Sequence, residues 1–181
     1  MLSGKINGKA GLATFIGLID EEPAEPTILF LDFAQIEFAS GSYLRESTFN
    51  FKKFVRSSYS NFYPVVANIT DEIAEELRMV AELSGDVVMS CVLDRKGHPS
   101  NPVLLGSLDP KQDMTFGLVE TLGSCDANGL MKTHGAQEST KSTTAWNNRL
   151  SGLAARGVVR EFTSGRSKHY RPLFAGDNHG G

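Results

Sequence analysis

The chain has 181 residues, enough for one medium-sized domain or two small ones, and 40% of them are hydrophobic, as in an ordinary globular protein. No apolar run approaches the roughly 20 residues that a membrane-spanning helix needs, and the first residues, Met1 to Lys5, lack the apolar core of a signal peptide. We therefore expect a cytoplasmic protein that does not enter a membrane.

The net charge of −3 hides an asymmetry between the two parts of the chain. Residues 1–109 carry 9 lysines and arginines against 15 aspartates and glutamates, whereas residues 110–181 carry 9 against 6, which gives charges of −6 and +3. A basic part beside an acidic part is typical of a protein whose basic part faces nucleic acid.

Cys91 and Cys125 both lie in apolar surroundings and lack the spacing of metal ligands. Because free cysteine is among the most buried residue types, we predict two buried thiols rather than a disulfide. We expect no metal and no other cofactor.

The first half of the chain begins with a mixed segment of glycines and apolar residues, of which residues 12–19 predict a short helix or an irregular edge strand. An acidic loop follows at residues 20–26. Apolar runs and helical spacing then predict strands and helices in alternation, at 27–33, 43–55, 63–67, 71–83 and 86–93. We expect Thr70 or Asp71 to cap the second of these helices. The alternation predicts a parallel sheet with right-handed crossovers.

Two stretches in this half resemble a known family. One is Ile-Leu-Phe-Leu-Asp-Phe-Ala-Gln-Ile-Glu-Phe-Ala-Ser-Gly-Ser-Tyr-Leu from Ile28, and the other is Pro-Val-Val-Ala-Asn-Ile from Pro64. With them, residues 27–93 resemble the STAS-like domain, the fold of sulfate-transporter tails and anti-sigma-factor antagonists. The resemblance implies an α/β domain over residues 1–94, with a parallel or mixed sheet, that senses a signal or docks a partner. It also implies that such a partner has an ATPase or kinase fold.

In the regulatory members of that family, a serine that follows an aspartate at the start of a helix is phosphorylated. Here the corresponding loop is Phe-Ala-Ser-Gly-Ser from Phe38, with no aspartate before either serine. Ser42 is thus either the N-cap of a helix, whose hydroxyl satisfies a backbone amide, or a phosphosite that gates a partner. The sequence also leaves open whether Ser40 or Ser42 is modified.

Residues 95–111 contain glycine and proline, which break regular structure, and we predict a linker there. The apolar triplet Val-Leu-Leu from Val103 predicts that part of this linker packs down, so that the two domains are held together.

The second half contains an amphipathic helix and a hairpin. Apolar residues recur at helical spacing on one face of residues 140–156, and polar residues occupy the other: Trp146, Leu150, Leu153 and Ala154 against Lys141, Thr144, Asn148 and Ser151. We expect Gly157 to end this helix. Residues 158–162 and 167–173 are expected to pair around a four-residue turn that contains glycine.

The motifs Thr-Thr-Ala-Trp-Asn-Asn-Arg-Leu from Thr143, Leu-Ala-Ala-Arg-Gly-Val-Val-Arg from Leu153, and Gly-Arg-Ser-Lys-His-Tyr-Arg-Pro-Leu from Gly165 resemble a winged helix-turn-helix domain. In that resemblance, residues 115–122, 127–134 and 140–156 are its helices and residues 160–173 are its wing. It implies an α+β domain over residues 112–174 that binds double-stranded DNA, and it suggests a homodimer on palindromic sites. We expect residues 175–181 to be a disordered tail.

The expected DNA contacts come from the third helix and from the hairpin. Asparagine can hydrogen-bond adenine, arginine can hydrogen-bond guanine, and a threonine methyl can contact thymine. The candidates on the helix are Lys141, Ser142, Thr144, Asn147, Asn148 and Arg149, and the candidates for phosphate on the hairpin are Arg166, Lys168 and His169. The alternatives are a solvated helix face and an ordinary charged turn, with one asparagine or Arg149 bracing a neighbouring helix.

We predict a DNA-binding transcriptional regulator that catalyses no reaction. The chain has no Cys-x-x-Cys pair, no Walker-type phosphate loop and no Gly-x-Ser-x-Gly motif. An adaptor of the anti-sigma-antagonist type, whose winged helix docks protein instead of DNA, is the alternative. A small-molecule enzyme at the carboxyl edge of the sheet is a weaker third hypothesis.

Overall fold

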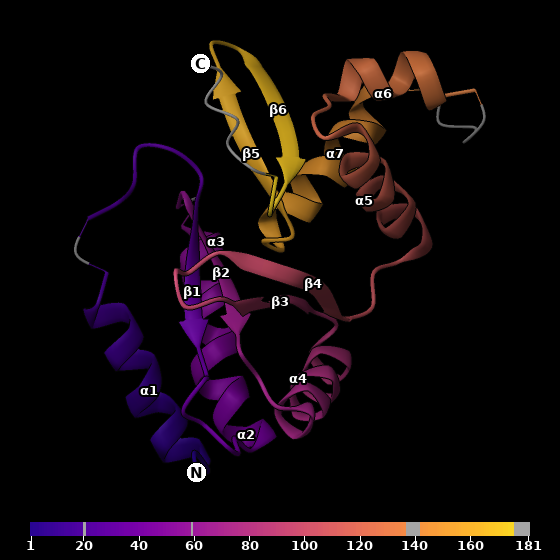
Figure 1. Cartoon of the computed structure of the whole chain (residues 1–181). Helices are drawn as coiled ribbons and strands as arrows, with labels where there is room; N and C mark the ends of the chain where they lie inside the picture. The colour runs from indigo at the N-terminus through magenta and orange to yellow at the C-terminus, as the bar shows by residue number, and fades with distance from the viewer. Residues whose placement is uncertain (20, 59, 137–141, 176–181) are drawn as a thin grey trace. The chain divides into compact units, whose positions relative to one another are not determined.

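The protein is described by a computed structural model, which covers residues 1–19, 21–58, 60–136 and 142–175. The fold is mixed α/β and divides into two compact units, Met1–Leu108 and Asp109–Gly181 (Figure 1). We describe each unit by itself. No helix among the described residues is long and apolar enough to cross a bilayer.

A four-stranded mixed sheet forms the centre of the first unit, with its strands in sequence order. Three of them run parallel, and the last is antiparallel to its neighbour. The strands are β1 (Thr27–Asp32), β2 (Phe62–Ala67), β3 (Val87–Leu93) and β4 (Pro99–Gly106). Three strands were predicted close to these positions, and the antiparallel fourth strand was not.

The pairing between β2 and β3 covers only two residue pairs, Val66 with Ser90 and Ala67 with Cys91. Even-numbered residues of β2 face β3, as the hydrogen bond from the Asn68 amide to the Cys91 carbonyl shows. Pro64 also faces β3, but proline has no N–H to donate to a ladder. The hydrogen-bonded pairing therefore begins only after it.

The predicted linker at 95–111 was wrong, because this segment contains β4 and its residues up to Leu108 belong to the first unit. The Gly-His-Pro sequence forms a tight turn between β3 and β4: the Asp94 carboxylate accepts hydrogen bonds from the amides of Lys96 and His98, and Gly97 has φ +80°. Glycine and proline thus mark a hairpin here rather than a tether between domains. The boundary between the units lies after Leu108, near the end of residues 95–111.

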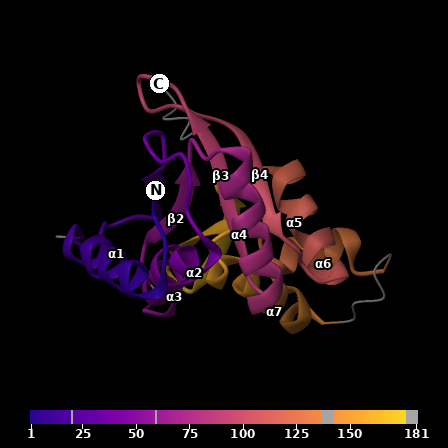
Figure 2. The same cartoon turned by 90° about the horizontal axis from the view of Figure 1, so that it is seen from below.

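The helices of the first unit bury their apolar residues against one side of the sheet (Figures 1 and 2). These include α2 (Gly41–Leu44), the π-helical turn η1 (Arg45–Phe49), α3 (Asn50–Ser57) and α4 (Asp71–Ser84). One core cluster joins them to the strands, with Leu44, Phe51, Ile73, Leu77, Val66 and Val88 among its members. The Thr70 hydroxyl caps α4 by accepting from the Ile73 amide at 3.3 Å, which confirms one of the two predicted caps.

The glycine-rich amino-terminal segment forms a helix, α1 (Lys5–Gly17), that is longer than the short helix or edge strand predicted at residues 12–19. It contacts α2, η1 and α3. A Cβ at Gly8 would lie 2.8 Å from the Tyr43 carbonyl oxygen, and a Cβ at Gly11 would lie 2.6 Å from the Tyr43 hydroxyl. The glycines, which lower helix propensity, are needed here for close packing.

The described residues of the second unit form three helices and a hairpin. They are α5 (Pro110–Leu122), α6 (Ala127–His134), α7 (Thr143–Ala155), β5 (Val159–Ser164) and β6 (Ser167–Pro172). The first helix starts five residues before the predicted position because Asp109 caps it, accepting from two amides at 3.0 Å, and Pro110 suits its first turn. Trp146, Leu150 and Leu153 of α7 are fully buried. The predicted tail lies outside the described residues, except for Ala175.

The first unit contains a buried ion pair, which we expect to contribute strongly to its stability. The Lys52 ammonium, on a residue only 3% exposed, donates to the Asp86 carboxylate at 2.6 Å and to the Val87 carbonyl oxygen. We predict that Lys52→Ala lowers the free energy of unfolding by about 3 kcal/mol, because it leaves a partly buried carboxylate without its cation. Urea denaturation measures this. The control is Lys53→Ala at the exposed neighbouring residue, which should change the free energy of unfolding by less than about 0.5 kcal/mol. Equal effects of the two substitutions would contradict the prediction.

Candidate functional site

The apolar side of α7 is buried, and the polar side, opposite to it, is exposed to solvent. The Ser142 hydroxyl caps the helix by accepting from the Ala145 amide at 3.2 Å. The buried stripe begins at Trp146, and Thr144, Asn147 and Asn148 are exposed on the other side. The helix ends at Ala155, before Gly157 at φ +75°. The amphipathic helix and its glycine stop were both predicted.

The hairpin formed by β5 and β6 carries exposed residues from Thr163 to Lys168. The last pair in its register is Ser164 with Ser167, and Gly165 between them has φ +61°, a left-handed conformation that glycine adopts without strain. Arg166 is the other residue of this turn, so its side chain stands at the tip of the hairpin.

An isolated β-bridge ties the segment before α6 to the hairpin. The Cys125 amide donates to the Tyr170 carbonyl oxygen at 3.0 Å, and the Tyr170 amide donates to the Cys125 carbonyl oxygen at 2.8 Å. Asp126 follows at once and caps α6, with its carboxylate accepting from the Gly129 amide at 2.7 Å. The bridge therefore fixes the first turn of α6 beside β6.

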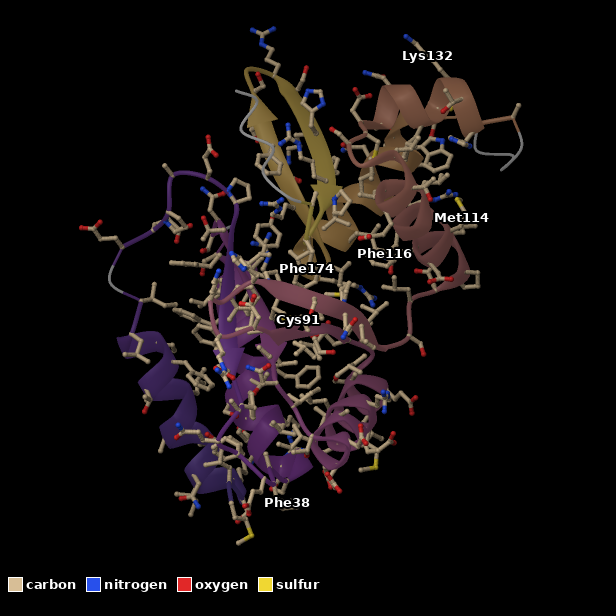
Figure 3. The ribbon with its side chains drawn as sticks, in the orientation of Figure 1. Phe38, Cys91, Met114, Phe116, Lys132 and Phe174 are labelled. Carbon is tan, nitrogen blue, oxygen red and sulfur yellow. The ribbon has the colours of Figure 1, made fainter. Side chains whose placement is uncertain are left out.

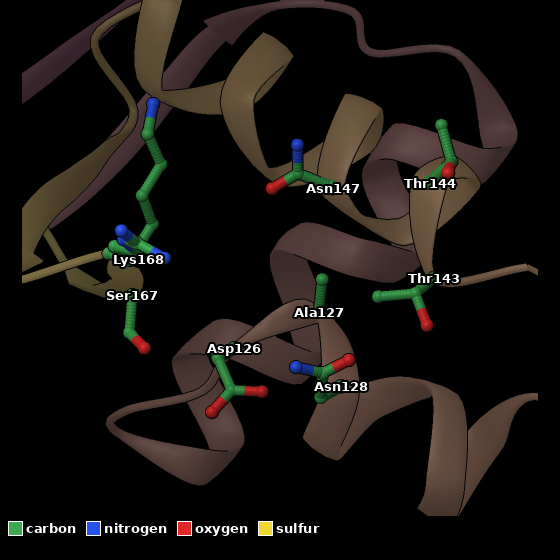
Figure 4. Close-up of a pocket in the computed structure, with 9 residues that line it drawn as sticks. Asp126, Ala127, Asn128, Thr143, Thr144, Asn147, Ser167 and Lys168 are labelled. Atoms are coloured by element: carbon green, nitrogen blue, oxygen red, sulfur yellow. The ribbon is translucent and has the colours of Figure 1, made fainter.

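These three elements enclose a hollow of about 470 Å³ (Figure 4). Polar and charged side chains predominate in its lining, which comprises Asp126, Ala127, Asn128, Thr143, Thr144, Asn147, Arg166, Ser167 and Lys168. The N-termini of α6 and α7 both contribute to it, and helix N-termini carry partial positive charge and unsatisfied N–H groups. The hollow thus offers hydrogen-bond donors and cations to one ligand surface.

Carboxylates partly neutralise the cations around this hollow. Lys168 Nζ lies 2.8 Å from Glu161 Oε1, and the Asp126 carboxylate stands at the start of α6 on the lining of the hollow. Arg166 is exposed and makes no ion pair within the part of the chain that the structure describes. Lys168 is exposed, so an anionic ligand can reach its ammonium from the solvent side.

Four of the predicted contact residues lie together at the hollow: Thr144, Asn147, Arg166 and Lys168. Asn148 is exposed on the adjoining stripe of α7, and His169 is half-buried on β6. Lys141 lies outside the described residues. Arg149 is half-buried with its guanidinium carbon 4.9 Å from the centre of the Trp146 ring, the geometry of a cation–π contact. The contact lies within α7 itself and holds the guanidinium against the Trp146 ring.

The sequence did not point to the contribution from α6. Asp126, Asn128, Thr143 and Ser167 line the hollow but were not among the predicted site residues. The signal available was the capping position: an aspartate directly before a predicted helix marks a terminus whose amides are exposed. It could not show that this terminus faces the hairpin, because the bridge between Cys125 and Tyr170 is a pairing distant in sequence.

The candidate phosphosite, in the first unit, has an acidic neighbour. Ser40, not Ser42, is the N-cap of α2, since the Ser40 hydroxyl accepts from the Tyr43 amide at 3.4 Å; our N-cap interpretation of Ser42 was wrong. Ser42 is exposed, and its hydroxyl lies 3.1 Å from that of Ser40. The Glu76 carboxylate already accepts from the Gly41 amide at 2.6 Å. A phosphate on either serine would therefore meet a like charge.

The described residues contain no group of three or more histidines, cysteines, aspartates or glutamates that could hold a metal ion. Comparisons with known protein families, with curated proteins and with solved structures find no match to this chain.

The cysteines are free thiols in the structure, as predicted; Cys91, labelled in Figure 3, lies on β3. Cys91 is buried, whereas Cys125 is only half-buried. Burial raises the pKa of the Cys125 thiol from 9.0 to about 11, and the neighbouring Asp126 carboxylate adds to the shift. Because the folded state holds the proton more tightly, this group's contribution to stability is present below pH 9 and is lost as the pH rises towards 11.

We predict that iodoacetamide at pH 8 alkylates Cys125 about a hundredfold more slowly in the folded protein than in urea, because only the thiolate reacts and its fraction falls with the raised pKa. Peptide mapping by mass spectrometry measures the two rates separately from those of Cys91. Equal rates in the two states would show that the thiol at the base of the hairpin is open to solvent.

Proposed function

We propose that the protein is a cytoplasmic DNA-binding transcriptional regulator. In this proposal the second unit is a winged helix-turn-helix domain, and the first is a STAS-like domain that senses a signal or docks a partner. One observation carries the proposal: the exposed polar face of α7 and the basic hairpin border the same hollow, so a single double helix could contact both.

The chemistry at the hollow suits a nucleic acid. Asn147 offers an amide that can hydrogen-bond the adenine edge in the major groove, and Thr144 offers a hydroxyl and a methyl. The amides at the start of α7, which has no acidic residue in its first turn, suit backbone phosphate. Arg166 and Lys168 supply the cations that fix the register of a helix on a duplex without reading its sequence.

The electrostatic attraction per subunit is modest, because much of the basic charge of the second unit stabilises its fold. Arg160 is buried and donates to the carbonyl oxygens of Pro172 and Ala175, and Arg171 lies over the Phe162 ring at 4.8 Å. Two copies on a palindromic site would double the number of phosphate contacts. A homodimer that blocks or recruits the transcription machinery is therefore part of the proposal.

A protein adaptor remains the second candidate function, and the carboxylates near the hollow favour it. Asp126 and Glu161 place negative charge among the cations, as on a surface that meets a protein of mixed charge. The two candidates differ in salt dependence. Affinity for DNA falls steeply with salt because counterions are released, whereas an adaptor would have no measurable affinity for DNA.

We predict that Arg166→Ala weakens binding to every duplex sequence and lowers the slope of log affinity against log salt by about 0.9, since one phosphate contact is lost. Fluorescence anisotropy with labelled duplexes over a salt series measures the slope. Lys132→Ala is the matched control, because this exposed lysine on α6 points away from the protein and does not line the hollow (Figure 3). If both variants keep the wild-type slope, the hairpin does not contact phosphate.

We predict that Asn147→Ala costs about 1–3 kcal/mol at the preferred site and little at unrelated sequences, because it removes a contact to a base edge. A binding-site selection on randomised duplexes identifies the preferred site. Titrations of the selected duplex and of an unrelated duplex then measure both affinities. Asn148→Ala is the comparison on the adjoining stripe of the same helix. A loss that is equal for all sequences would assign Asn147 to the phosphate backbone instead.

A further inference from the structure

The outer edge of β1 is a free edge of the four-stranded sheet. The strand order places β1 at one end, and no described strand pairs with its outer side. Between Thr27 and Asp32 its four residues are all apolar. An exposed edge of this kind is a template for pairing with another chain.

The hydrogen bonds to β2 determine which backbone groups of β1 are free. The Thr27 amide donates to the Asn61 carbonyl oxygen at 2.7 Å, and the Phe33 amide donates to the Ala67 carbonyl oxygen at 2.9 Å. Odd-numbered residues of β1 thus face β2. In a parallel ladder the N–H and C=O of one residue point the same way, so Ile28, Phe30 and Asp32 present both groups at the outer edge.

An apolar hollow of about 240 Å³ runs along this edge. Leu29, Phe30, Leu31 and Asp32 all line it. Because successive residues of a strand point to opposite faces of a sheet, a hollow that touches four in a row lies along the edge of the strand rather than on one face. Its other wall consists of apolar side chains from the end of α1 and from α3, namely Phe15, Leu18, Ile19 and Phe51.

The two edges of the sheet differ in their protection against pairing. At the β4 edge, Pro99 and Pro102 lack N–H groups, Asn101 has φ +50°, and the register with β3 shifts between Ser90 and Val92. Prolines and bulges are the devices by which proteins block edge pairing. β1 has neither device, and an apolar hollow lies along its edge instead.

The charge of the segments that flank β1 in the sequence indicates what kind of strand fits. Between Lys9 and Arg45 the sequence has six aspartates and glutamates and no lysine, arginine or histidine. The carboxyl end of α1, whose last residues border the hollow, adds partial negative charge with no basic residue in its last turn. A second copy of this chain is disfavoured there, because antiparallel pairing of two β1 strands would bring Asp32 of one copy towards Glu25 of the other.

We propose that the β1 edge docks an extended segment of a partner protein, with alternating apolar residues flanked by lysine or arginine. The segment would add a fifth strand to the sheet, and its apolar side chains would fill the hollow beside α1, the recognition mode known as β-strand addition. The inference goes beyond the proposed function and does not depend on DNA binding, because every residue that carries it belongs to the first unit.

The test uses the full chain and the synthetic peptide Lys-Lys-Val-Thr-Val-Thr-Val-Lys-Lys, with amide hydrogen exchange read residue by residue. In the free protein, the amides of Ile28, Phe30 and Asp32 should exchange fast, whereas those of Leu29 and Leu31 should be protected by β2. Binding of the peptide should protect the amides of Ile28, Phe30 and Asp32 from exchange. A peptide with glutamate in place of every lysine should bind at least about tenfold more weakly, since it meets the acidic edge.

Two substitutions that leave the charge unchanged distinguish binding at the hollow from non-specific hydrophobic binding of the peptide. Leu18→Ser removes an apolar side chain that lines the hollow and is 74% exposed, and Leu83→Ser removes one that is 90% exposed on α4. Leu18→Ser should lower the affinity of the protein for the peptide by about tenfold, and Leu83→Ser should leave that affinity unchanged. The proposal is overturned if the peptide protects none of the three amides, if the two variants behave alike, or if raising the protein concentration alone protects them, which would make a second copy the occupant.

Discussion

The burial of one helix stripe determines what the second unit can present to a partner. Trp146, Leu150 and Leu153 have no exposed surface, and burying a side chain of this size contributes roughly 1.5–3 kcal/mol. The rotation of α7 is thereby fixed, and Thr144 and Asn147 must face outward. Arg149 adds to this by lying over the Trp146 ring. The candidate interface therefore depends on packing that no ligand touches.

The periodic elements could be predicted from the sequence. The apolar stripe of α7, the glycine after it and the hairpin all follow short-range patterns, and α6 lies at the predicted residues 127–134. The errors occurred where glycine and proline serve packing or turns: α1 contains glycines because it approaches Tyr43 closely, and the segment predicted as a linker contains β4. Propensity describes local preference, whereas these residues respond to distant contacts.

The candidate site was predicted only in part, for a related reason. The residue types on α7 and the hairpin indicate chemistry without indicating which of them meet. The bridge between Cys125 and Tyr170 brings α6 to the hairpin, and the ion pair between Lys168 and Glu161 removes part of the charge that a residue count would assign to the hairpin. Both facts depend on three-dimensional proximity. The charge split between the two parts of the chain overstates the cationic surface for this reason.

The short ladder between β2 and β3 has a mechanical consequence for the first unit. With Pro64 on the side that faces β3, the register between β2 and β3 covers two residue pairs, with Asn68 bonding to β3 just beyond them, whereas β1 and β2 are paired over six. The sheet thus has a seam, and tension or partial melting should part it there, leaving a βαβ half and a hairpin half. Side chains in the core must hold that seam closed, so the sheet can flex about it without breaking a long row of backbone bonds.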